Sequence, residues 1–158
     1  MTRPRLLVAT RSEHKLRELG ELLALERGEL VSLDGLRVEG DPVEDGLTFR
    51  TNAAIKARFG AERTGLPTLA DDSGLEVDAL DGGPGVRTRR YAGEDASDAD
   101  NNAKLLAALE GLQPVRRGAR YVCVLALAMP GERLVFARGT CRGRIAAAPR
   151  GTGGFGYD

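Results

Sequence analysis

The sequence of 158 residues contains no tryptophan, a single histidine, His14, and only two cysteines, Cys123 and Cys141. Two cysteines are too few for a disulfide framework. They form no Cys-x-x-Cys pair, and with one histidine they provide too few ligands for a zinc site. A Ser-His-Asp or Cys-His hydrolase would have to use His14, and no nucleophile-elbow motif accompanies it. We therefore interpret the cysteines as reduced structural thiols and expect a cytoplasmic protein.

Net charge is also missing, because 23 basic residues balance 23 acidic ones. Broad, charge-driven binding to nucleic acid or to a membrane surface needs an excess of cations, so we expect neither partner. No apolar run approaches the length of a membrane span, and the N-terminus lacks the apolar core of a secretory signal. A small anionic ligand stays compatible with this composition, since a local cluster of cations is enough to bind it.

Lysine is scarce, and Lys15, Lys56 and Lys104 are the only lysines among the 23 basic residues. The chain thus uses arginine as its general surface cation. A lysine is then expected where a compact ammonium charge is needed that a planar guanidinium cannot replace. The alternative is that the three lysines are ordinary solvated residues.

The pattern of apolar and polar residues predicts one α/β domain, with a hydrophobic content of 42%. Strands are predicted at residues 5–9, 31–38, 66–70, 75–80, 121–129 and 134–138, the last two joined as a hairpin. Helices are predicted after the caps Ser12, Thr48 and Ser97, ending at Gly28, at Gly60 or Gly65, and at Gly111. Residues 40–46 form an acidic loop in this interpretation. Because strands and helices alternate early and a hairpin comes late, we expect a mixed sheet.

The first candidate site lies between the first strand and the first helix, and its residues are Thr10, Arg11, Ser12, Glu13, His14 and Lys15. Backbone N–H groups at a helix start, together with the helix dipole, favour a phosphate group. Hydroxyl groups and the lysine charge add to this, although the glycines of a Walker A loop are absent. A plainly capped helix is the alternative.

Two further polar residues, Asn52 and Lys56, are spaced i and i+4 on the second predicted helix and therefore share one face. Phe49, Ala53 and Ala57 supply an apolar face, so the polar pair can look into a cleft. A solvated polar stripe is the alternative interpretation.

An acidic pair, Asp71-Asp72, followed by Ser73 and Gly74, comes directly after an apolar strand. Ligands of α/β sheets usually bind at the carboxyl ends of strands, and alternation sends neighbouring side chains to opposite sides. One aspartate can therefore face a ligand while the other braces the loop. Carboxylates suit Mg²⁺, which keeps several waters, and Glu44 of the acidic loop is a second candidate ligand. An Asx-type turn without metal is the alternative.

The closing segment, Gly151–Asp158, contains four glycines, which let the backbone approach a ligand closely. Phe155 and Tyr157 supply aromatic faces on which a base can stack. The alternative is a flexible terminal tail.

Together these segments resemble the ITPase family, the Ham1/RdgB-type pyrophosphatases of non-canonical purine nucleoside triphosphates. The matching segments are Leu7–Lys15 with Arg17-Glu18-Leu19, Gly46–Phe49 with Asn52-Ala53 and Lys56-Ala57, Ala70–Leu80, Gly83–Val86, Arg90–Gly93 and Gly151–Asp158. They follow the family's order across the whole chain, and Ala70–Leu80 is the most specific of them.

The resemblance implies a long mixed β-sheet flanked by helices in two lobes, with the active site in a central cleft and a homodimer as the assembly. It also implies a hydrolase that converts ITP, dITP and XTP to the monophosphate and pyrophosphate. Water attacks the α-phosphorus in this reaction, Mg²⁺ is the cofactor, and the nucleotide pool is cleared of non-standard purines.

Residue roles follow from the same resemblance. Asp72 falls on the family's catalytic aspartate, which helps to hold Mg²⁺ and orients or deprotonates the water, and Glu44 falls on or near a metal-binding acid. Lys15 and Lys56 would act in catalysis by neutralising the triphosphate. The implied substrate-binding residues are Thr10, Arg11, Ser12, Glu13, His14, Lys15, Asn52, Lys56, Ser73, Phe155, Gly156, Tyr157 and Asp158.

The sequence departs from the family pattern in two ways. Ser12 stands where the family usually carries asparagine, and because a hydroxyl still donates a hydrogen bond, we expect a tuned site rather than an inactive one. Family members continue with a strand and a helix that carry a Ser-His-Arg motif reading the purine 6-position. We therefore expect residues 1–158 to form a single domain without these two elements, and the preferred base stays open.

Two rival functions remain at this point. A Maf-like nucleotide pyrophosphatase has a related fold, but its opening loop resembles Ala-Ser-x-Ser-Pro-Arg-Arg, which Ala9–Glu13 matches poorly. A non-catalytic nucleotide sensor would keep the pocket without turnover, because fold and pocket alone never prove turnover. The presence of Asp72, Lys15 and Lys56 weighs against the sensor.

Overall fold

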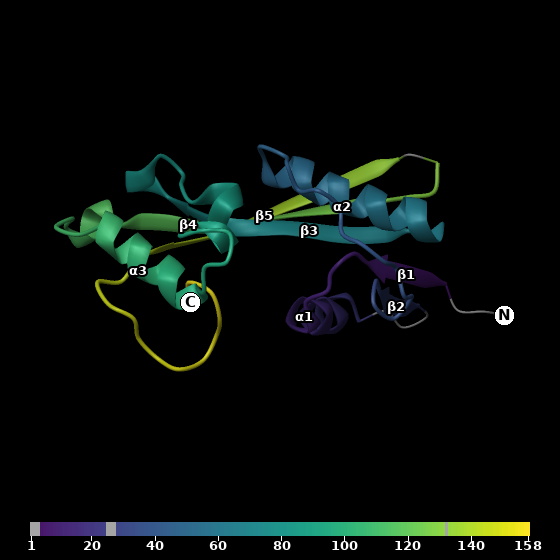
Figure 1. The fold of residues 1–158 in the computed structure, drawn as a ribbon, viewed down its shortest axis with the longest axis horizontal. Helices are drawn as coiled ribbons and strands as arrows, with labels where there is room; N and C mark the ends of the chain where they lie inside the picture. The colour runs from purple at the N-terminus through teal and green to yellow at the C-terminus, as the bar shows by residue number, and fades with distance from the viewer. Residues whose placement is uncertain (1–3, 25–27, 132) are drawn as a thin grey trace. The chain divides into compact units, whose positions relative to one another are not determined.

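The computed structural model describes residues 4–24, 28–131 and 133–158. Its helices and strands, in chain order, are β1 (Arg5–Val8), α1 (Glu13–Leu23), β2 (Glu29–Ser32), α2 (Phe49–Thr64), β3 (Thr68–Val77), α3 (Asp98–Ala108), β4 (Gly118–Ala128) and β5 (Leu134–Arg144), as labelled in Figure 1. Three short 3-10 helices, η1 (Asp78–Leu80), η2 (Gly85–Arg90) and η3 (Pro114–Arg116), complete the described elements.

The strands form one mixed sheet in the order β2-β1-β3-β4-β5. β1 runs parallel to both of its neighbours, with Leu7 opposite Val31 on one side and Thr68 on the other. The predicted α/β class with a mixed sheet is therefore confirmed. Among the described residues, no helix is long and apolar enough to cross a membrane.

The chain divides into two compact units, the first made of Met1–Asp72 and Val124–Arg138, the second of Ser73–Cys123 and Gly139–Asp158. The strands β3, β4 and β5 each contribute residues to both units. Each unit has its own buried residues, and each is described separately below.

The first unit buries α2 against the parallel strands. Its fully buried side chains include Leu7, Ala53 and Ala57, all at 0% exposure. Figure 1 shows α2 running alongside β3. A Cβ added to Gly60 of this helix would come within 2.7 Å of the Thr68 side chain and 2.9 Å of the Leu7 side chain. The absence of a side chain at position 60 is what allows this close approach of helix and sheet.

The second unit has a core of Leu75, Val77, Leu105, Leu109 and Ala119, so α3 packs on β3 and β4. A buried arginine links separate segments of this unit by hydrogen bonds. Arg117 is 7% exposed and donates hydrogen bonds to the backbone carbonyl oxygens of Leu109, Ile145 and Ala146, at 2.7, 2.9 and 2.8 Å. The Leu109 carbonyl lies at the C-terminal end of α3, where a positive charge interacts favourably with the helix dipole.

Three helix starts and one hairpin were predicted correctly. Ser12 and Thr48 accept hydrogen bonds from the backbone N–H groups of Lys15 and Thr51, and Ser97 forms a capping box with Asp100. The hairpin of β4 and β5 closes with a 2.9 Å bond from the Met129 N–H to the Arg133 carbonyl. The helix caps and the hairpin depend on hydrogen bonds between residues close in sequence, and such features can be predicted from the spacing of residue types.

Several boundaries were wrong, among them the end of α3, which lies at Ala108 instead of Gly111, and the end of β5, which lies at Arg144 instead of residue 138. The first helix ends at Leu23 because Ala24 adopts a left-handed conformation and bonds back to Gly20 at 3.2 Å, so it does not reach Gly28. The second strand covers Glu29–Ser32, since pairing with β1 selects this register and a turn follows it. The two strands predicted at 66–70 and 75–80 are joined in one continuous strand, β3, which ends at Val77, and residues 78–80 form η1 instead.

The continuity of β3 corrects the expected loop at Asp71-Asp72-Ser73-Gly74, which lies inside the strand. Aspartate, serine and glycine in a row are typical of turns, because their side chains compete with regular backbone pairing. Here the two carboxylates find lysine partners, Lys15 for Asp71 and Lys56 for Asp72, so the backbone can stay extended.

Candidate active site

The segment between β1 and α1 is organised by hydroxyl groups. The Thr10 Oγ1 atom accepts a hydrogen bond from the Ser12 N–H at 3.1 Å, and the Ser12 Oγ atom accepts one from the Lys15 N–H at 3.4 Å. Both hydroxyls accept in these bonds, so each keeps its own O–H to donate. The start of α1 therefore presents two hydroxyl donors beside the positive end of a helix dipole.

Lys15 pairs with the first aspartate of β3. Its Nζ atom lies 2.7 Å from the Asp71 Oδ2 atom, and the Asp71 side chain is 9% exposed while that of Lys15 is 34% exposed. The buried carboxylate holds the ammonium group in one place, because an unpaired buried charge is costly. Lys15 keeps one side toward solvent, where it can meet an anion.

Lys56 joins two carboxylates from different elements. Its Nζ atom lies 3.1 Å from Glu44 Oε2 and 3.5 Å from Asp72 Oδ1. The side chains of Lys56 and Asp72 are each 15% exposed, and that of Glu44 is 38% exposed. One lysine thus brings together the two acids that sequence reasoning proposed as metal ligands.

Asn52 holds the loop that carries Glu44. The Asn52 side chain is 2% exposed, and its Oδ1 atom accepts a 2.8 Å hydrogen bond from the Gly46 N–H. A Cβ at Gly46 would overlap the Asn52 side chain, so the loop can lie this close only with glycine at position 46. The predicted pair Asn52 and Lys56 therefore occupies one face of α2 and contacts the acidic loop.

Asp72 has an atom without a partner. Its Oδ2 atom is buried and makes no hydrogen bond within the part of the chain that the structure describes. Burial raises the pKa of Asp72 above its ordinary value, while the charge of Lys56 and hydrogen bonding by Asn52 oppose this rise. A buried carboxylate oxygen with unused acceptor capacity is suited to hold a cation or a water molecule.

The described residues contain no group of three or more histidine, cysteine, aspartate or glutamate side chains arranged to hold a metal ion. This arrangement still fits Mg²⁺, which is usually held by one or two carboxylates together with waters and substrate phosphates. Both cysteines, Cys123 and Cys141, are free thiols.

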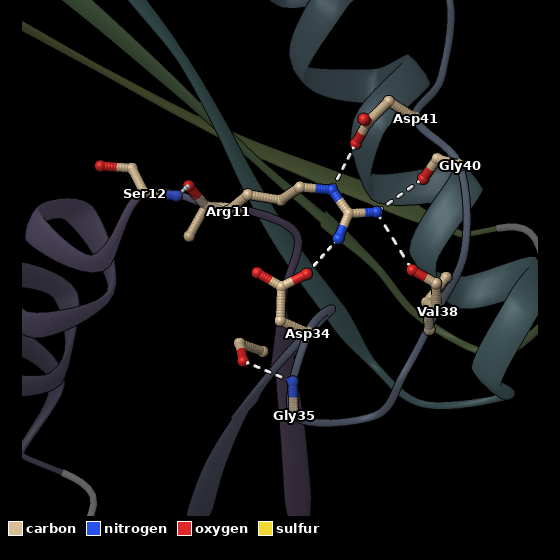
Figure 2. A network of polar contacts seen from close by, with 9 residues as sticks. Arg11, Ser12, Asp34, Gly35, Val38, Gly40 and Asp41 are labelled. Carbon is tan, nitrogen blue, oxygen red and sulfur yellow. Dashed lines mark hydrogen bonds and ion pairs between the residues drawn. The ribbon is translucent and has the colours of Figure 1, made fainter.

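Arg11 belongs to a separate network, shown in Figure 2. Its guanidinium contacts the carboxylates of Asp34 and Asp41 and the carbonyl oxygens of Val38 and Gly40. The Ser12 side chain points away from this network in the same view. The neighbouring Glu13 and His14 are exposed in the first turn of α1. Within the segment predicted to bind phosphate, the Arg11 side chain is therefore directed at this network, while the Ser12 side chain points away from it (Figure 2).

In the second unit, hydrogen bonds anchor the closing segment. The Gly156 N–H donates to Asp98 Oδ2 at 2.8 Å, and the Asn102 Nδ2 atom donates to the Gly156 carbonyl at 2.9 Å. The Tyr157 hydroxyl donates to the Thr88 carbonyl at 2.7 Å. These contacts describe an attached segment rather than the free tail that was the alternative.

Two side chains of this segment differ in exposure and contacts. The Phe155 side chain is 57% exposed. Asp158 accepts hydrogen bonds from the Tyr121 hydroxyl and from the Phe155 N–H, each at 3.1 Å. Ser73 is exposed in the part of β3 that belongs to this unit. Asp98 and Asn102 were not identified from the sequence as partners of the closing segment, although Asp98 comes directly after the predicted helix cap Ser97.

The first unit thus defines an α/β protein in which lysines from two helices meet carboxylates of one strand and one loop, an arrangement suited to an anionic ligand. The family model described as the Ham1 family matches residues 6–158. The chain belongs to the Ham1 family.

Similar proteins agree with this assignment. The dITP/XTP pyrophosphatase of Geobacter sulfurreducens is 51% identical over 154 residues, covering 98% of this chain and 77% of the relative. The protein of the same name from Geobacillus kaustophilus is 48% identical, covering 97% and 75%. The solved structure of a HAM1 protein from Coxiella burnetii matches with a TM-score of 0.90 at 43% identity, covering 98% of this chain and 79% of that one.

Proposed function

We propose that this chain hydrolyses the non-canonical purine nucleoside triphosphates ITP, dITP and XTP to the monophosphate and pyrophosphate. The cluster of the first unit carries the proposal, because it pairs Lys15 with Asp71 and Lys56 with both Asp72 and Glu44. Family membership supports the choice of reaction, since the two relatives at 51% and 48% identity are named dITP/XTP pyrophosphatases.

The triphosphate would bind at the start of α1. The O–H groups of Thr10 and Ser12 donate to phosphate oxygens, and the backbone at Arg11, Glu13 and His14 adds the helix-start amides. Lys15 and Lys56 neutralise the negative charge that these oxygens carry. Neutralisation matters most in the transition state, where fixed charges act without the reorganisation that water would need.

Asp72 is the proposed catalytic base. Its ionised carboxylate accepts a proton from a water molecule, and the water oxygen forms a bond to the α-phosphorus. The bond from the α-phosphorus to the bridging oxygen breaks, so that pyrophosphate leaves with the electron pair. Burial raises the pKa of Asp72, and the charge of Lys56, 3.5 Å away, acts in the opposite direction and favours the ionised form. Asn52, fixed by Gly46, keeps the neighbouring loop in place.

Mg²⁺ is the proposed cofactor, and Asp72 and Glu44 would hold it. The buried Asp72 Oδ2 atom without a hydrogen-bond partner among the described residues supports this, and Glu44 shares Lys56 with Asp72. When bound, the ion supplies charge neutralisation and polarises phosphate oxygens.

In the second unit, we propose that Ser73 and the closing segment from Phe155 to Asp158 contact the purine base. The exposed ring of Phe155 offers a stacking face, and the hydrogen bonds of Gly156 with Asp98 and Asn102 hold the neighbouring backbone in place. A homodimer and a cytoplasmic location, implied by the family resemblance and by the reduced thiols, remain predictions.

Pyrophosphate release from ITP, XTP, dTTP, UTP and GTP in the presence of Mg²⁺ tests the function. We expect rapid release from ITP and XTP, and a loss of about 10²–10⁴-fold in kcat for Asp72→Asn, which cannot accept the proton. Asp95→Asn, the same change at an exposed loop position, is the matched control and should retain activity.

Other outcomes would assign other functions. Preference for dTTP or UTP would favour a Maf-like pyrophosphatase. Tight nucleotide binding with no release from any of the five substrates would favour a sensor and contradict the proposal.

A further inference from the structure

The guanidinium of Arg11 contacts four acceptor groups of the first unit. Its Nε atom donates to Asp41 Oδ1 at 2.7 Å, and its Nη1 atom pairs with Asp34 Oδ1. Its Nη2 atom donates to the carbonyl oxygens of Val38 and Gly40, at 3.0 and 2.8 Å. Figure 2 shows these four acceptors around a single guanidinium.

The acceptors belong to the chain that leads to Glu44. Asp34, Val38 and Gly40 lie in the stretch after β2, and Asp41 precedes Pro42 and is therefore restricted to extended backbone. Glu44 follows Asp41 by three positions, a reach of about 10 Å at most. A fixed Asp41 thus limits where the Glu44 carboxylate can lie, and that carboxylate contacts Lys56 at 3.1 Å.

On its other side, Arg11 lies between two residues of the proposed phosphate-binding segment. Thr10 and Ser12 are hydrogen-bonded to each other across it at 3.1 Å, and Ser12 caps the helix that carries Lys15. The side chain of Arg11 is one-third exposed, at 33%. Four of its five N–H donors are directed at Asp34, Asp41 and the carbonyl groups between them, and so away from the phosphate-binding segment.

We propose that Arg11 is a positioning residue, whose guanidinium fastens the start of α1 to the acidic loop so that Glu44 is held beside Lys56 and Asp72. The proposal rests on the proposed function, because it concerns the geometry of that same site. The backbone of Arg11 stays among the phosphate contacts, and the side chain acts through the loop.

Arginine is needed here for its shape. A guanidinium presents five N–H donors in a planar fork, which can serve two carboxylates and two carbonyls at once. A lysine has three donors on a single nitrogen and cannot reach all four acceptors. Single exposed ion pairs contribute little to stability, so the value of this network lies in fixing a geometry.

The variant Arg11→Lys tests this, because it keeps the charge and removes the fork. Arg58→Lys, the same change at an exposed position of α2, is the matched control. We expect the Mg²⁺ concentration for half-maximal pyrophosphate release to rise about tenfold for Arg11→Lys and to stay unchanged for Arg58→Lys. Asp41→Ala, on the opposite side of the contact, should give the same rise.

Two further measurements separate positioning from general stability. Backbone hydrogen exchange of residues 38–46 should become faster in Arg11→Lys and stay unchanged in Arg58→Lys. In a Glu44→Gln background, Arg11→Lys should add no further change in Mg²⁺ dependence, since its effect passes through Glu44.

Unchanged exchange of residues 38–46 together with unchanged Mg²⁺ dependence would overturn the proposal, as would full additivity with Glu44→Gln. If the unsubstituted protein released no pyrophosphate from any nucleotide, the proposed function would fail instead. The exchange comparison would still decide whether Arg11 holds the loop.

Discussion

Lys56 shows why the kind of cation matters at a single position. Its ammonium group is 15% exposed and lies between Glu44 at 3.1 Å and Asp72 at 3.5 Å. A compact charge fits between two carboxylates, whereas a planar guanidinium needs more room and turns its donors in fixed directions. The sequence led us to expect the few lysines where a compact ammonium charge is needed, and the position of Lys56 agrees with that expectation.

The variant Lys56→Arg should therefore lose activity although it keeps the charge. We expect kcat/KM for ITP to fall about 10²-fold, because the cation no longer sits where charge develops in the transition state. Steady-state kinetics measure this change. Lys104→Arg is the control, since Lys104 donates to the Tyr91 carbonyl at 2.7 Å in the second unit and lies outside the proposed machinery. Equal activity of Lys56→Arg and the unsubstituted protein would remove the need for a compact charge.

At this scale, sequence reasoning chose Lys15 and Lys56 but missed the partners that hold them. Lys15 meets Asp71 across 56 positions of sequence, and no local pattern marks that pair. Arg11 shows the same limit, because its acceptors Asp34 and Asp41 lie 23 and 30 positions away. Contacts over such separations depend on how strands and helices pack, and spacing along the chain carries no information about them.

Among the elements, the close packing of α2 gives a sharp test. Glycine inside a helix normally destabilises it by roughly 0.5–1 kcal/mol relative to alanine. At Gly60, however, a new Cβ would lie 2.7 Å from Thr68 and 2.9 Å from Leu7, and both of those residues are fully buried. The helix or the sheet must then shift.

We expect Gly60→Ala to lower the free energy of unfolding by about 1–3 kcal/mol, as overpacked cores do. Gly20→Ala in α1 is the matched control, because its Cβ would meet only Leu30, at an ordinary 3.7 Å. That change should raise the free energy of unfolding by up to about 1 kcal/mol. Urea denaturation of the two variants measures both effects, and a stabilising Gly60→Ala would contradict the packing described here.

The closing segment depends on the Tyr157 hydroxyl, which donates to the Thr88 carbonyl at 2.7 Å. Burial raises the pKa of Tyr157 from 10.0 to about 12, with smaller contributions from Tyr91 and Asp98. Because the pKa is higher in the folded state than in the unfolded state, this residue stabilises the fold fully below pH 10. The contribution is lost as the pH rises through about 12.

Tyr157→Phe should lower the free energy of unfolding by about 0.5–1.5 kcal/mol at neutral pH, the usual value of one hydrogen bond. The difference between the two proteins should narrow as the pH rises from 10 toward 12, where the hydroxyl ionises. Urea titrations at several pH values measure it. A difference that stays constant across this range would show that the hydroxyl does not couple to stability.

For the whole molecule, ligand binding should appear as thermal stabilisation. A ligand that binds only the folded state at a hundred times its dissociation constant adds about 2.7 kcal/mol to the free energy of unfolding. For a chain of this size, that corresponds to a rise of roughly 5–10 °C in the unfolding midpoint. We expect this rise with Mg²⁺ and an α,β-methylene analogue of ITP, which cannot be cleaved at the reacting bond.

Calorimetry with and without a chelator separates the metal from the nucleotide. The rise should shrink when the chelator removes Mg²⁺, and it should shrink in Asp72→Asn, whose amide is a poorer cation ligand than a carboxylate. An equal rise with the chelator present would argue against a metal held by Asp72 and Glu44. Sedimentation equilibrium of the same samples checks the predicted homodimer.

The sequence by itself determined the α/β class through its pattern of apolar and polar residues. It also determined the helix starts at Ser12, Thr48 and Ser97 and the final hairpin, because these depend on hydrogen bonds between near neighbours. It also carried the family resemblance, which is written in ordered motifs. Only the tertiary structure decided that β3 runs unbroken through Asp71 and Asp72, since distant lysines neutralise these acids and let the backbone pair. The same holds for the network of Arg11, which exists only once β1 and β2 lie side by side and bring the acidic loop to the start of α1.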